Sequence, residues 1–268
     1  MTAPLRVERP RAGVARVVLD RPDLRNAFDD DLVARVTATF TALGADPSVR
    51  AVVLAGAGKA FCAGADLSWM KRMVTYGEEE NRRDAEALGR MFLAVDACPK
   101  PVVGRVQGAA LGGGAGLVAA CDVAVCAEGA LLGTTEVRLG IVPGVISPFV
   151  VRKIGESHAR RWFLTGERFS AAEALRAGLV HAVVPEAELD AEVDRVLDGL
   201  LLGGPEALAV SKGLAKRMGR LPLDEALGEA AGVIAARRAS AEGQEGMKAF
   251  LERRSPGWTR ERADGSGS

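Results

Sequence analysis

The sequence predicts an α/β fold in which strands alternate with helices along the first half of the chain. Three features of the sequence indicate it. Short apolar runs rich in valine have the length and composition of buried strands. Charged or amphipathic helical stretches separate these runs. Glycine-rich segments stand where two of the strands end, and from about Ser147 onward the pattern changes to helices.

The N-terminal part contains two predicted strands with a helix between them. Val14–Leu19 is the first strand, and Arg21-Pro22-Asp23 ends it. Asp29–Leu43 is predicted to be a helix because its apolar residues fall on one face and its opening acids complement the helix dipole. Ala51–Leu54 is a strand of the buried type, and the glycine-rich loop from Gly56 to Gly64 follows it.

The same alternation continues through the middle of the chain. Glu78–Val95 is a charged helical stretch, which Pro99-Lys100-Pro101 must end. Val102–Val106 is a further strand. The glycine-rich turn that begins at Gly108 leads into a short helix through about Ala120, and Val123–Cys126 is another strand. Strands joined through helices in this way favour parallel pairing with right-handed crossovers.

The C-terminal part is predicted to be helical. Ala191–Leu202 carries its apolar residues on one side, and Pro205 and Pro222 stand where a first helical turn accepts proline. The sequence therefore predicts an α/β core over residues 1–200 and a helical region over residues 201–268. The polar C-terminal tail is expected to fray.

The composition excludes several classes of function. Lysine plus arginine equals aspartate plus glutamate at 35 each, so no long-range field favours nucleic acid or an anionic membrane. No apolar run reaches the length of a signal peptide or of a membrane span, so the expected location is the cytoplasm. A nucleotide P-loop and a serine-hydrolase GxSxG elbow are both missing from the sequence.

The cysteines and histidines do not indicate a disulfide framework or a metal site. No CxxC spacing occurs, and reduced, buried thiols are the usual state of intracellular cysteine. The two histidines are far apart and belong to no HxxxH pattern, so no metal site is predicted. The residues concerned are Cys62, Cys98, Cys121, Cys126, His158 and His181.

Two glycine-rich loops are the candidate ligand site. Lys59–Leu67 (KAFCAGADL) and Gly108–Gly116 (GAALGGGAG) each follow a predicted buried strand, and loops at the carboxyl ends of such strands converge. Three glycines at Gly112–Gly114 open a helix, where free N–H groups and the positive dipole end favour an anion. Glycine-rich turns also serve only to change chain direction. The residues alone indicate a ligand-binding α/β protein with anion-stabilising turns.

Several segments resemble the enoyl-CoA hydratase/isomerase (crotonase) family over essentially the whole chain, in the family's order. The resemblance implies the crotonase-like ββα spiral core with a helical trimerisation region. The matching segments are Arg21-Pro22 through Asn26-Ala27, KAFCAGADL, VQGAALGGGAGL leading to CDVAV, EVRLGIVPG, LTGERFSAAEALRAGLV and EGMKAFLERRSPGWT.

The resemblance implies specific catalytic residues. The backbone N–H groups of Ala65 and Gly113 would bind the thioester oxygen as negative charge develops on it. Hydratases of the family place two glutamates around one water. The second corresponds to Glu136, and the first corresponds to Gly116, so that carboxylate is missing here. Without the resemblance, Glu136 would be taken for an ordinary surface glutamate.

Three explanations of Gly116 stay open. Glu136 alone could both activate water and protonate C2, as in a one-carboxylate hydratase. A Δ3,Δ2-enoyl-CoA isomerase would need only one base and no water. A polar group of the substrate, or an ordered water, could replace the missing carboxylate.

A narrower resemblance concerns the substrate. Ala65–Met73 and Val145–Arg152 look most like bacterial 3-methylglutaconyl-CoA hydratases of leucine catabolism, which also carry glycine at the first-glutamate position. Such a substrate has a distal carboxylate that needs a charged partner. Lys71 and Arg72 are the candidates, although both could simply be solvated charges on a helix. Trp69 is expected to form pocket wall or core.

The resemblance also implies where coenzyme A would bind and how subunits assemble. The CoA is part of the substrate, and no separate cofactor is expected. The chain is expected to form a homo-oligomer, a trimer or a hexamer of two stacked trimers, with the C-terminal CoA contacts often made on the adjacent subunit. The implied CoA contacts are Arg25, Ala27, Lys59, Ala63, Ala65, Asp66, Leu67, Phe250 and Arg253, the last replacing a lysine.

The sequence thus predicts a hydro-lyase that interconverts 3-methylglutaconyl-CoA and 3-hydroxy-3-methylglutaryl-CoA. A general enoyl-CoA hydratase and the isomerase are the enzymatic alternatives. A non-catalytic, RNA-binding protein on the same scaffold is the alternative from another class, and the zero net charge argues against it.

Overall fold

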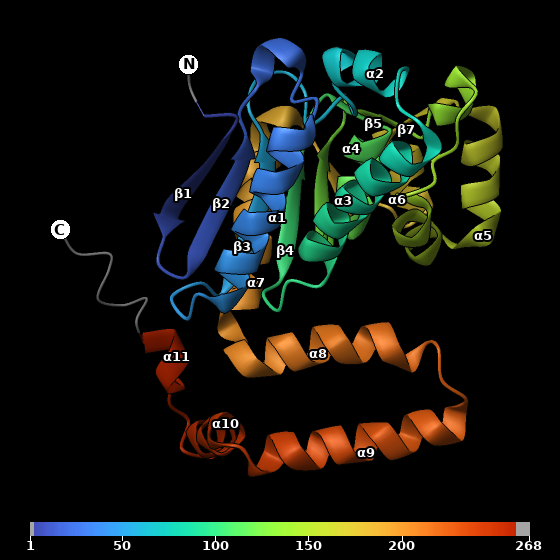
Figure 1. The fold of residues 1–268 in the computed structure, drawn as a ribbon. Helices are drawn as coiled ribbons and strands as arrows, with labels where there is room; N and C mark the ends of the chain where they lie inside the picture. The colour runs from blue at the N-terminus through green and yellow to red at the C-terminus, as the bar shows by residue number, and fades with distance from the viewer. Residues whose placement is uncertain (1–2, 261–268) are drawn as a thin grey trace.

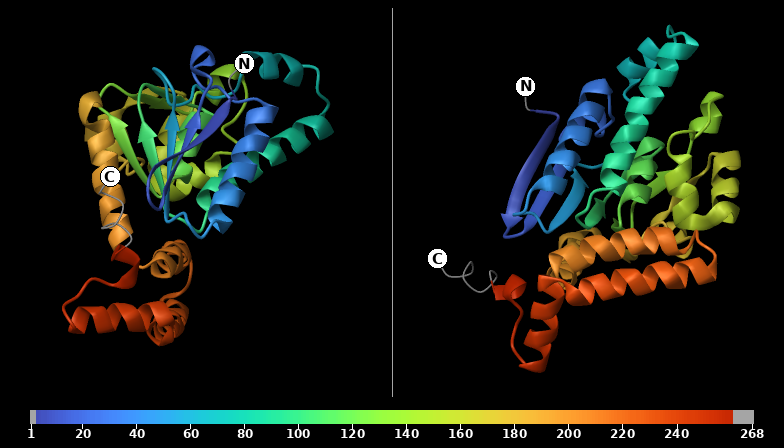
Figure 2. Two further views of the ribbon diagram at one scale, coloured as in Figure 1. Left: turned by 90° about the vertical axis from the view of Figure 1, so that its left-hand side faces the viewer. Right: turned by 60° about the horizontal axis from the view of Figure 1, so that its bottom comes forward.

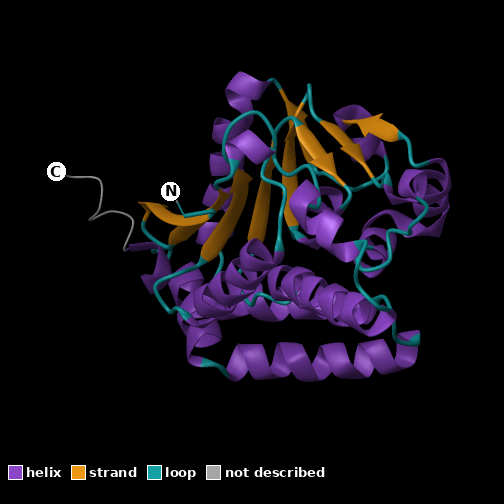
Figure 3. Cartoon of the chain, turned by 45° about the horizontal axis from the view of Figure 1, so that its top comes forward, coloured by secondary structure: helices purple, strands orange, loops and turns teal. Residues whose placement is uncertain are grey.

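In a computed structural model, which describes residues 3–260, the strands form two sheets (Figures 1 and 3). The main sheet has the order β1 (Leu5–Arg11), β2 (Val14–Leu19), β3 (Ala51–Gly56), β4 (Val102–Val106), β6 (Val123–Ala127) and β9 (Ala182–Val184). All neighbours pair in parallel except β1 and β2, which are antiparallel. The smaller sheet has the order β5 (Ala109–Leu111), β7 (Leu131–Gly133) and β8 (Arg168–Ser170).

Helices join and cover these strands, as the sequence predicts. They are α1 (Asp30–Ala45), α2 (Leu67–Met73), α3 (Glu78–Asp96), α4 (Gly113–Ala120), α5 (Ser147–Thr165), α6 (Ala171–Arg176), α7 (Leu189–Leu202), α8 (Pro205–Met218), α9 (Leu223–Ala239), α10 (Ala241–Leu251) and α11 (Gly257–Arg260). Short 3-10 helices lie at η1 (Pro22–Leu24), η2 (Glu136–Leu139) and η3 (Glu186–Glu188). The mixed α/β class and the helical C-terminal region are confirmed. The predicted change to helices from about Ser147 is wrong in part, because the short strands β8 and β9 follow it and complete the two sheets.

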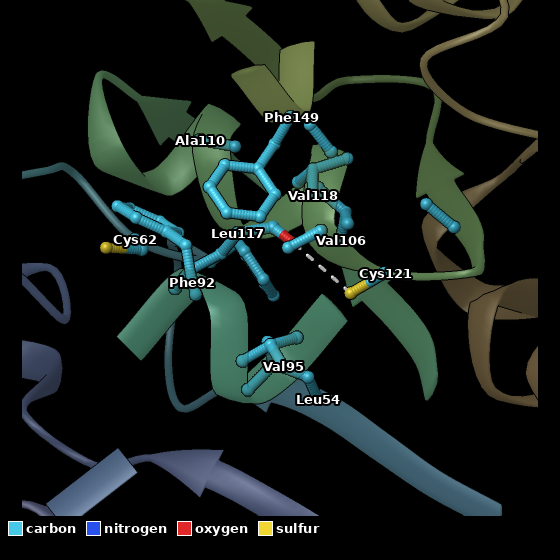
Figure 4. Close-up of a cluster of buried hydrophobic side chains, with 14 of the residues drawn as sticks. Leu54, Cys62, Phe92, Val95, Val106, Ala110, Leu117, Val118, Cys121 and Phe149 are labelled. Carbon is cyan, nitrogen blue, oxygen red and sulfur yellow. Dashed lines mark hydrogen bonds between the residues drawn. The ribbon is translucent and has the colours of Figure 1, made fainter. Parts of the chain in front are cut away.

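Side chains of the main sheet alternate between two hydrophobic cores. Along β3, Val52 and Leu54 face the core that contains α1 and α3, whereas Ala51 and Val53 face the core that contains α7. Burial on both faces explains why β3 is an unbroken apolar run. Figure 4 shows the larger core around α4, where Phe92 and Phe149 pack with ring centroids 5.7 Å apart.

The thiols behave as the sequence predicts. Cys62, Cys98, Cys121 and Cys126 are buried and free. Burial raises the pKa of Cys62, Cys121 and Cys126 to about 12, so these thiols are inert small apolar groups.

The C-terminal helices lie at the amino ends of the strands, opposite the glycine-rich loops (Figures 1 and 2). The Arg50 guanidinium, just before β3, donates to the carbonyls of Gly203 and Trp258 at 2.6 and 2.8 Å. Lys216 of α8 pairs with Asp96 at 2.9 Å. In α9, Ala226 is the one buried residue. The helical region therefore contacts the α/β part through polar groups of Gly203, Lys216 and Trp258, and α9 is largely exposed.

Three predictions concern the C-terminal tail, membrane-spanning helices and the division into regions. The predicted fraying of the C-terminal tail falls on residues 261–268, outside the described residues. Between residues 3 and 260, no helix has the length and apolar character needed to cross a bilayer. The division into residues 1–200 and 201–268 stays a prediction.

Candidate active site

The two glycine-rich loops meet through a ladder of backbone hydrogen bonds. The N–H of Phe61 donates to the carbonyl of Gln107 at 2.8 Å, and that of Cys62 donates to Ala109 at 3.0 Å. The N–H of Leu111 donates back to Cys62 at 3.0 Å. These bonds extend the smaller sheet by an isolated parallel bridge between Cys62 and Ala110. Segments almost 50 residues apart in sequence are therefore fixed side by side.

The ladder brings the backbones of Ala65 and Gly113 close together. A Cβ built on Gly64 would lie 3.9 Å from the amide nitrogen of Gly113. Among residues 3–260, neither the N–H of Ala65 nor that of Gly113 donates a hydrogen bond to the protein. Gly113 is the first residue of α4, so its N–H is one of the groups that a helix leaves unsatisfied. Two free amide donors thus stand in neighbouring turns.

The N–H of Ala65 is free because of how its neighbours pair. Ala65 forms a parallel bridge with Phe28, in which Gly64 accepts from the N–H of Phe28 and Asp66 donates to its carbonyl, both at 2.9 Å. In a parallel bridge the flanking residues make the bonds, and the central residue turns its own N–H to the opposite side. The chain therefore needs no special loop conformation at Ala65 to expose this donor.

The carboxyl group of Glu136 lies beside the same turn. Glu136 opens η2 three residues after the end of β7, and the N–H of Gly112 donates to Gly133 in β7 at 2.7 Å. A Cβ built on Gly112 would lie 3.3 Å from Glu136 Oε1. Glu136 Oε2 is buried and has no hydrogen-bond partner among residues 3–260. One carboxylate oxygen is therefore unengaged next to the opening of α4.

Burial also changes the acidity of this group. Desolvation raises the pKa of the Glu136 carboxyl above its ordinary value, and a hydrogen bond with its own backbone N–H offsets only part of that effect. A carboxyl whose pKa is raised toward neutrality can exchange a proton in both directions, as an acid–base catalyst must.

Apolar side chains fill the space beside Gly116, where the first of the two glutamates of the family's hydratases would lie. Gly116 is buried on α4, and a Cβ built on it would lie 2.4 Å from Ile146 Cγ2 and 3.0 Å from Phe92 Cε1. No side chain fits there without moving these neighbours. Glycine at this position is therefore part of the close packing of α4 against α3 and α5.

A comparison with known proteins identifies the family. The family model described as enoyl-CoA hydratase/isomerase matches residues 9–261. The chain belongs to this family. It is 34% identical to crotonyl-CoA hydratase of Syntrophomonas wolfei over 244 residues, which cover 90% of this chain and 92% of that protein.

Solved structures of similar proteins have the same fold. An enoyl-CoA hydratase from Shewanella pealeana superimposes with a TM-score of 0.92 at 38% identity, covering 96% of each chain. Pseudomonas aeruginosa AtuE superimposes with a TM-score of 0.92 at 41% identity, covering 96% of this chain and 100% of that chain. The crotonase-like fold predicted from the sequence motifs is therefore confirmed.

The residues that the resemblance implies as CoA contacts lie in two separate places, one beside the glycine-rich loops and one near the end of α10. Arg25 and Lys59 are exposed and lie in adjoining loops, since the carbonyl of Arg25 accepts from the N–H of Ala63 at 3.0 Å. Leu67, at the start of α2, is 75% exposed. Phe250 and Arg253 lie at the end of α10, near the opposite end of the sheet (Figure 1). Within one chain, these last two do not join the site.

Two of the implied contacts already use their backbone polar groups. Ala27 donates to Leu24 and its carbonyl accepts from Arg21, and Asp66 donates to Phe28 while its carbonyl accepts from Met70. Asp66 is also buried, and its carboxylate caps α2 by accepting from Ser68 and pairs with Arg21 at 3.0 Å. The N–H and carbonyl groups of Ala27 and Asp66 are therefore already engaged, and these residues could contact a ligand only by van der Waals packing of their backbones.

The two candidates for the distal carboxylate differ in their surroundings. Arg72 pairs with Asp30 at 2.5 Å, and interactions with Tyr76 and Asp30 raise the pKa of its guanidinium. Lys71 is exposed and has no ion pair among residues 3–260. Of the two side chains, Lys71 is therefore the one whose charge is not neutralised by a neighbouring carboxylate among residues 3–260.

Buried polar residues that the sequence analysis did not single out hold these loops. Asn26 is buried with φ of 56°, and its side-chain amide donates to the carbonyls of Ala57 and Ala60, each at 2.8 Å. The amide of Gln107 donates to Gly56 at 2.7 Å and to Gly58 at 3.0 Å. For Gln107 the available signal was a polar residue directly after an apolar strand, because buried amides are kept where they satisfy loop carbonyls. Asn26 stands among charged residues, so the sequence carried no such signal for it.

Proposed function

We propose that this chain adds water to the double bond of an enoyl-CoA thioester and that its preferred substrate is 3-methylglutaconyl-CoA. The observation that supports the proposal best is the meeting of two free amide donors with one unengaged carboxylate at the opening of α4. The relatives named as hydratases agree with it.

The two amide donors would stabilise the enolate. As water adds to C3, negative charge moves onto the thioester oxygen, and the N–H groups of Ala65 and Gly113 would accept that charge in two hydrogen bonds. The dipole of α4 adds to this stabilisation because Gly113 stands at its positive end. Removing one donor of this type costs roughly 10²–10³-fold in kcat.

Glu136 would handle the proton in both steps. Its carboxylate takes a proton from water while the water oxygen bonds to C3, and the resulting carboxylic acid then gives that proton to C2 of the enolate. No second carboxylate is required, and the steps use only water and the CoA thioester itself. The raised pKa of Glu136 suits a group that acts first as base and then as acid.

The filled space at Gly116 makes double-bond isomerisation the second candidate function. Moving a proton between C4 and C2 of a 3-enoyl-CoA needs one base and no water, and the protein has one carboxylate at this place. The two reactions differ in whether the product gains an oxygen atom from water. In ¹⁸O-labelled water, hydration incorporates the label into the product, and isomerisation does not.

Lys71 supports the substrate with a distal carboxylate. Of the two cations in α2, Lys71 has no ion pair in the described part of the chain, whereas Arg72 pairs with Asp30. We expect Lys71→Ala to raise the KM for 3-methylglutaconyl-CoA roughly 10–150-fold while leaving that for 3-methylcrotonyl-CoA unchanged, because a charge-assisted hydrogen bond contributes roughly 1.5–3 kcal/mol. Equal effects on both substrates would exclude this role.

The test is a substrate panel in ¹⁸O-labelled water. The enzyme is incubated with crotonyl-, 3-methylcrotonyl- and 3-methylglutaconyl-CoA, and products are followed by mass. We expect one labelled water per product, with the highest kcat/KM for 3-methylglutaconyl-CoA. Glu136→Gln should lower turnover by roughly 10²–10⁴-fold with little change in the Kd of CoA. Full activity of that variant would exclude Glu136 as the proton carrier.

The C-terminal residues of the CoA site would come from an adjacent subunit. Phe250 is 83% exposed, and Leu223, Leu227 and Ile234 of α9 are exposed as well. Exposed apolar surface of this kind marks subunit contacts. We propose a trimer or a hexamer, and sedimentation velocity tests it. A monomer at micromolar concentration would exclude this arrangement.

A further inference from the structure

We propose that Phe28 is the positioning residue that sets the spacing of the two amide donors. The inference rests on the proposed function, because it concerns the same oxyanion site. Phe28 lies between η1 and α1, is 2% exposed, and does not itself offer a polar group to a ligand. Its backbone contacts one donor, and its side chain contacts the other.

The backbone of Phe28 fixes the donor of Ala65. Its N–H donates to Gly64 and its carbonyl accepts from Asp66, both at 2.9 Å. These two bonds flank Ala65 on both sides. The direction of the Ala65 N–H is therefore determined by where the backbone of Phe28 lies.

The ring of Phe28 fixes the position of Gly113. A Cβ built on Gly113 would lie 2.2 Å from Phe28 Cζ and 2.8 Å from Cε2, so the ring edge occupies the place of a side chain at Gly113. This contact limits how closely the opening of α4 approaches Ala65. The spacing of the two donors is thus set through a single residue.

The ring is held in turn by two aromatic neighbours. Trp69 and Phe92 each pack edge-on, with centroids 6.5 Å from that of Phe28 and interplanar angles of 67° and 77°. Trp69 comes from α2 and Phe92 from α3. Edge-to-face packing of this kind restricts tilting of the ring. Phe28 therefore transmits the positions of α2 and α3 to the site.

Removing the ring should misplace one donor without removing it. In Phe28→Ala the flanking backbone bonds of Ala65 can remain, but the opening of α4 loses its support. Displacements of about 1 Å in a catalytic group can cost roughly 100-fold. We expect kcat to fall roughly 10–100-fold while the Kd of CoA changes less than about threefold, since the implied CoA contacts beside Phe28 depend on its backbone bonds and not on its ring. Phe28→Leu keeps much of the volume and should lose less.

A matched variant separates this effect from loss of packing. Phe40 is 1% exposed, belongs to the same core and lies on α1, and the three atoms nearest to a Cβ built on Gly113 all belong to Phe28 and not to Phe40. Phe40→Ala should lower stability to a similar extent but leave kcat near that of the wild type. Thermal unfolding followed by circular dichroism shows that each variant is folded at the assay temperature.

The decisive readout is the carbonyl carbon of a bound thioester. Butyryl-CoA labelled with ¹³C at the carbonyl is saturated and does not react, and hydrogen bonds to its oxygen move the ¹³C resonance downfield. We expect a downfield shift with the wild type and Phe40→Ala, a clearly smaller one with Phe28→Ala, and an intermediate one with Phe28→Leu. If Phe28→Ala does not fold, Phe28→Leu alone is compared with Phe40→Ala.

The outcomes distinguish the two proposals. No shift with the wild type would overturn the oxyanion site itself. A wild-type shift that Phe28→Ala, or Phe28→Leu in its place, retains in full together with wild-type kcat would overturn the role of Phe28 alone. A reduced shift with both Phe28→Ala and Phe40→Ala would also overturn it, because any loss of core packing would then have the same effect.

Discussion

Replacement of Gly116 tests whether the site has room for a second carboxylate. A Cβ at this position would lie 2.4 Å from Ile146 Cγ2, whereas ordinary contacts between carbons begin near 3.4 Å. The neighbours must therefore move by about 1 Å. Overpacking of this kind costs roughly 1–3 kcal/mol. We expect Gly116→Ala to lower the free energy of unfolding by that amount, and Gly116→Glu by more, because it also buries an unpaired carboxyl group.

The assay combines urea denaturation at neutral pH with steady-state hydration kinetics. Gly199→Ala is the matched control, since Gly199 lies in α7 and an added Cβ there meets no atom within 4 Å. That variant should be as stable as the wild type or more stable by about 0.5–1 kcal/mol. Combining Gly116→Ala with Ile146→Ala should cost less than the sum of the single changes, because the smaller side chain removes the clash.

Two results would refute this reasoning. Gly116→Ala with wild-type stability would mean that the space is open. A higher hydration rate in Gly116→Glu would mean that a carboxylate can be placed there productively, and that its absence limits catalysis in the natural protein.

Four further predictions concern the site and its support. Gly113→Ala should lower kcat with crotonyl-CoA roughly 10²–10³-fold, because the added Cβ would lie 2.2 Å from the ring of Phe28 and displace an oxyanion donor; an unchanged kcat contradicts this. Since burial raises the pKa of Glu136 and hydration needs the carboxylate, the rate should fall as pH falls through a value above 4.5, a limb that Glu136→Gln lacks. The carboxyl group of Glu136 contributes fully to stability below its unfolded pKa, and this contribution is lost as pH rises through the higher folded pKa. The melting temperature of Glu136→Gln should therefore rise relative to that of the wild type as pH increases from the ordinary value of 4.5 through the folded pKa. Asn26→Ala should cost roughly 1–3 kcal/mol in urea denaturation, because it leaves the carbonyls of Ala57 and Ala60 without a donor; a smaller loss would mean that water replaces the amide.

Strands buried on both faces could be predicted from the sequence, and the short ones could not. β2, β3, β4 and β6 are apolar runs, so their burial is visible in their composition. β1 is an edge strand that contains Pro10 and four charged residues. A search for apolar runs therefore does not detect it. β5 and β7 have three residues each and pair with segments distant in sequence, so no local pattern reveals them.

The residues of the candidate site could be named from the sequence through their motifs, but their arrangement could not. Ala65, Gly113 and Glu136 came from the family resemblance, and the chain itself indicated only two glycine-rich turns. The apolar filling beside Gly116 depends on Ile146 and Phe92, which lie about 30 and 24 residues away and carry no local signal. Contacts between residues so far apart in the sequence depend on the tertiary fold, which local propensity does not encode.

The backbone ladder between Phe61–Cys62 and Gln107–Leu111 limits how this enzyme can evolve. An insertion or deletion of one residue between Cys62 and Ala65 would translate the first donor by about 3.3 Å, the rise of one strand residue. That distance exceeds the tolerance of any hydrogen bond to the same oxygen. The length of this loop is therefore fixed once the ladder has formed. New acyl specificities would have to arise from side chains outside this loop, such as the exposed Lys71 of α2, rather than from changes in the length of the loop.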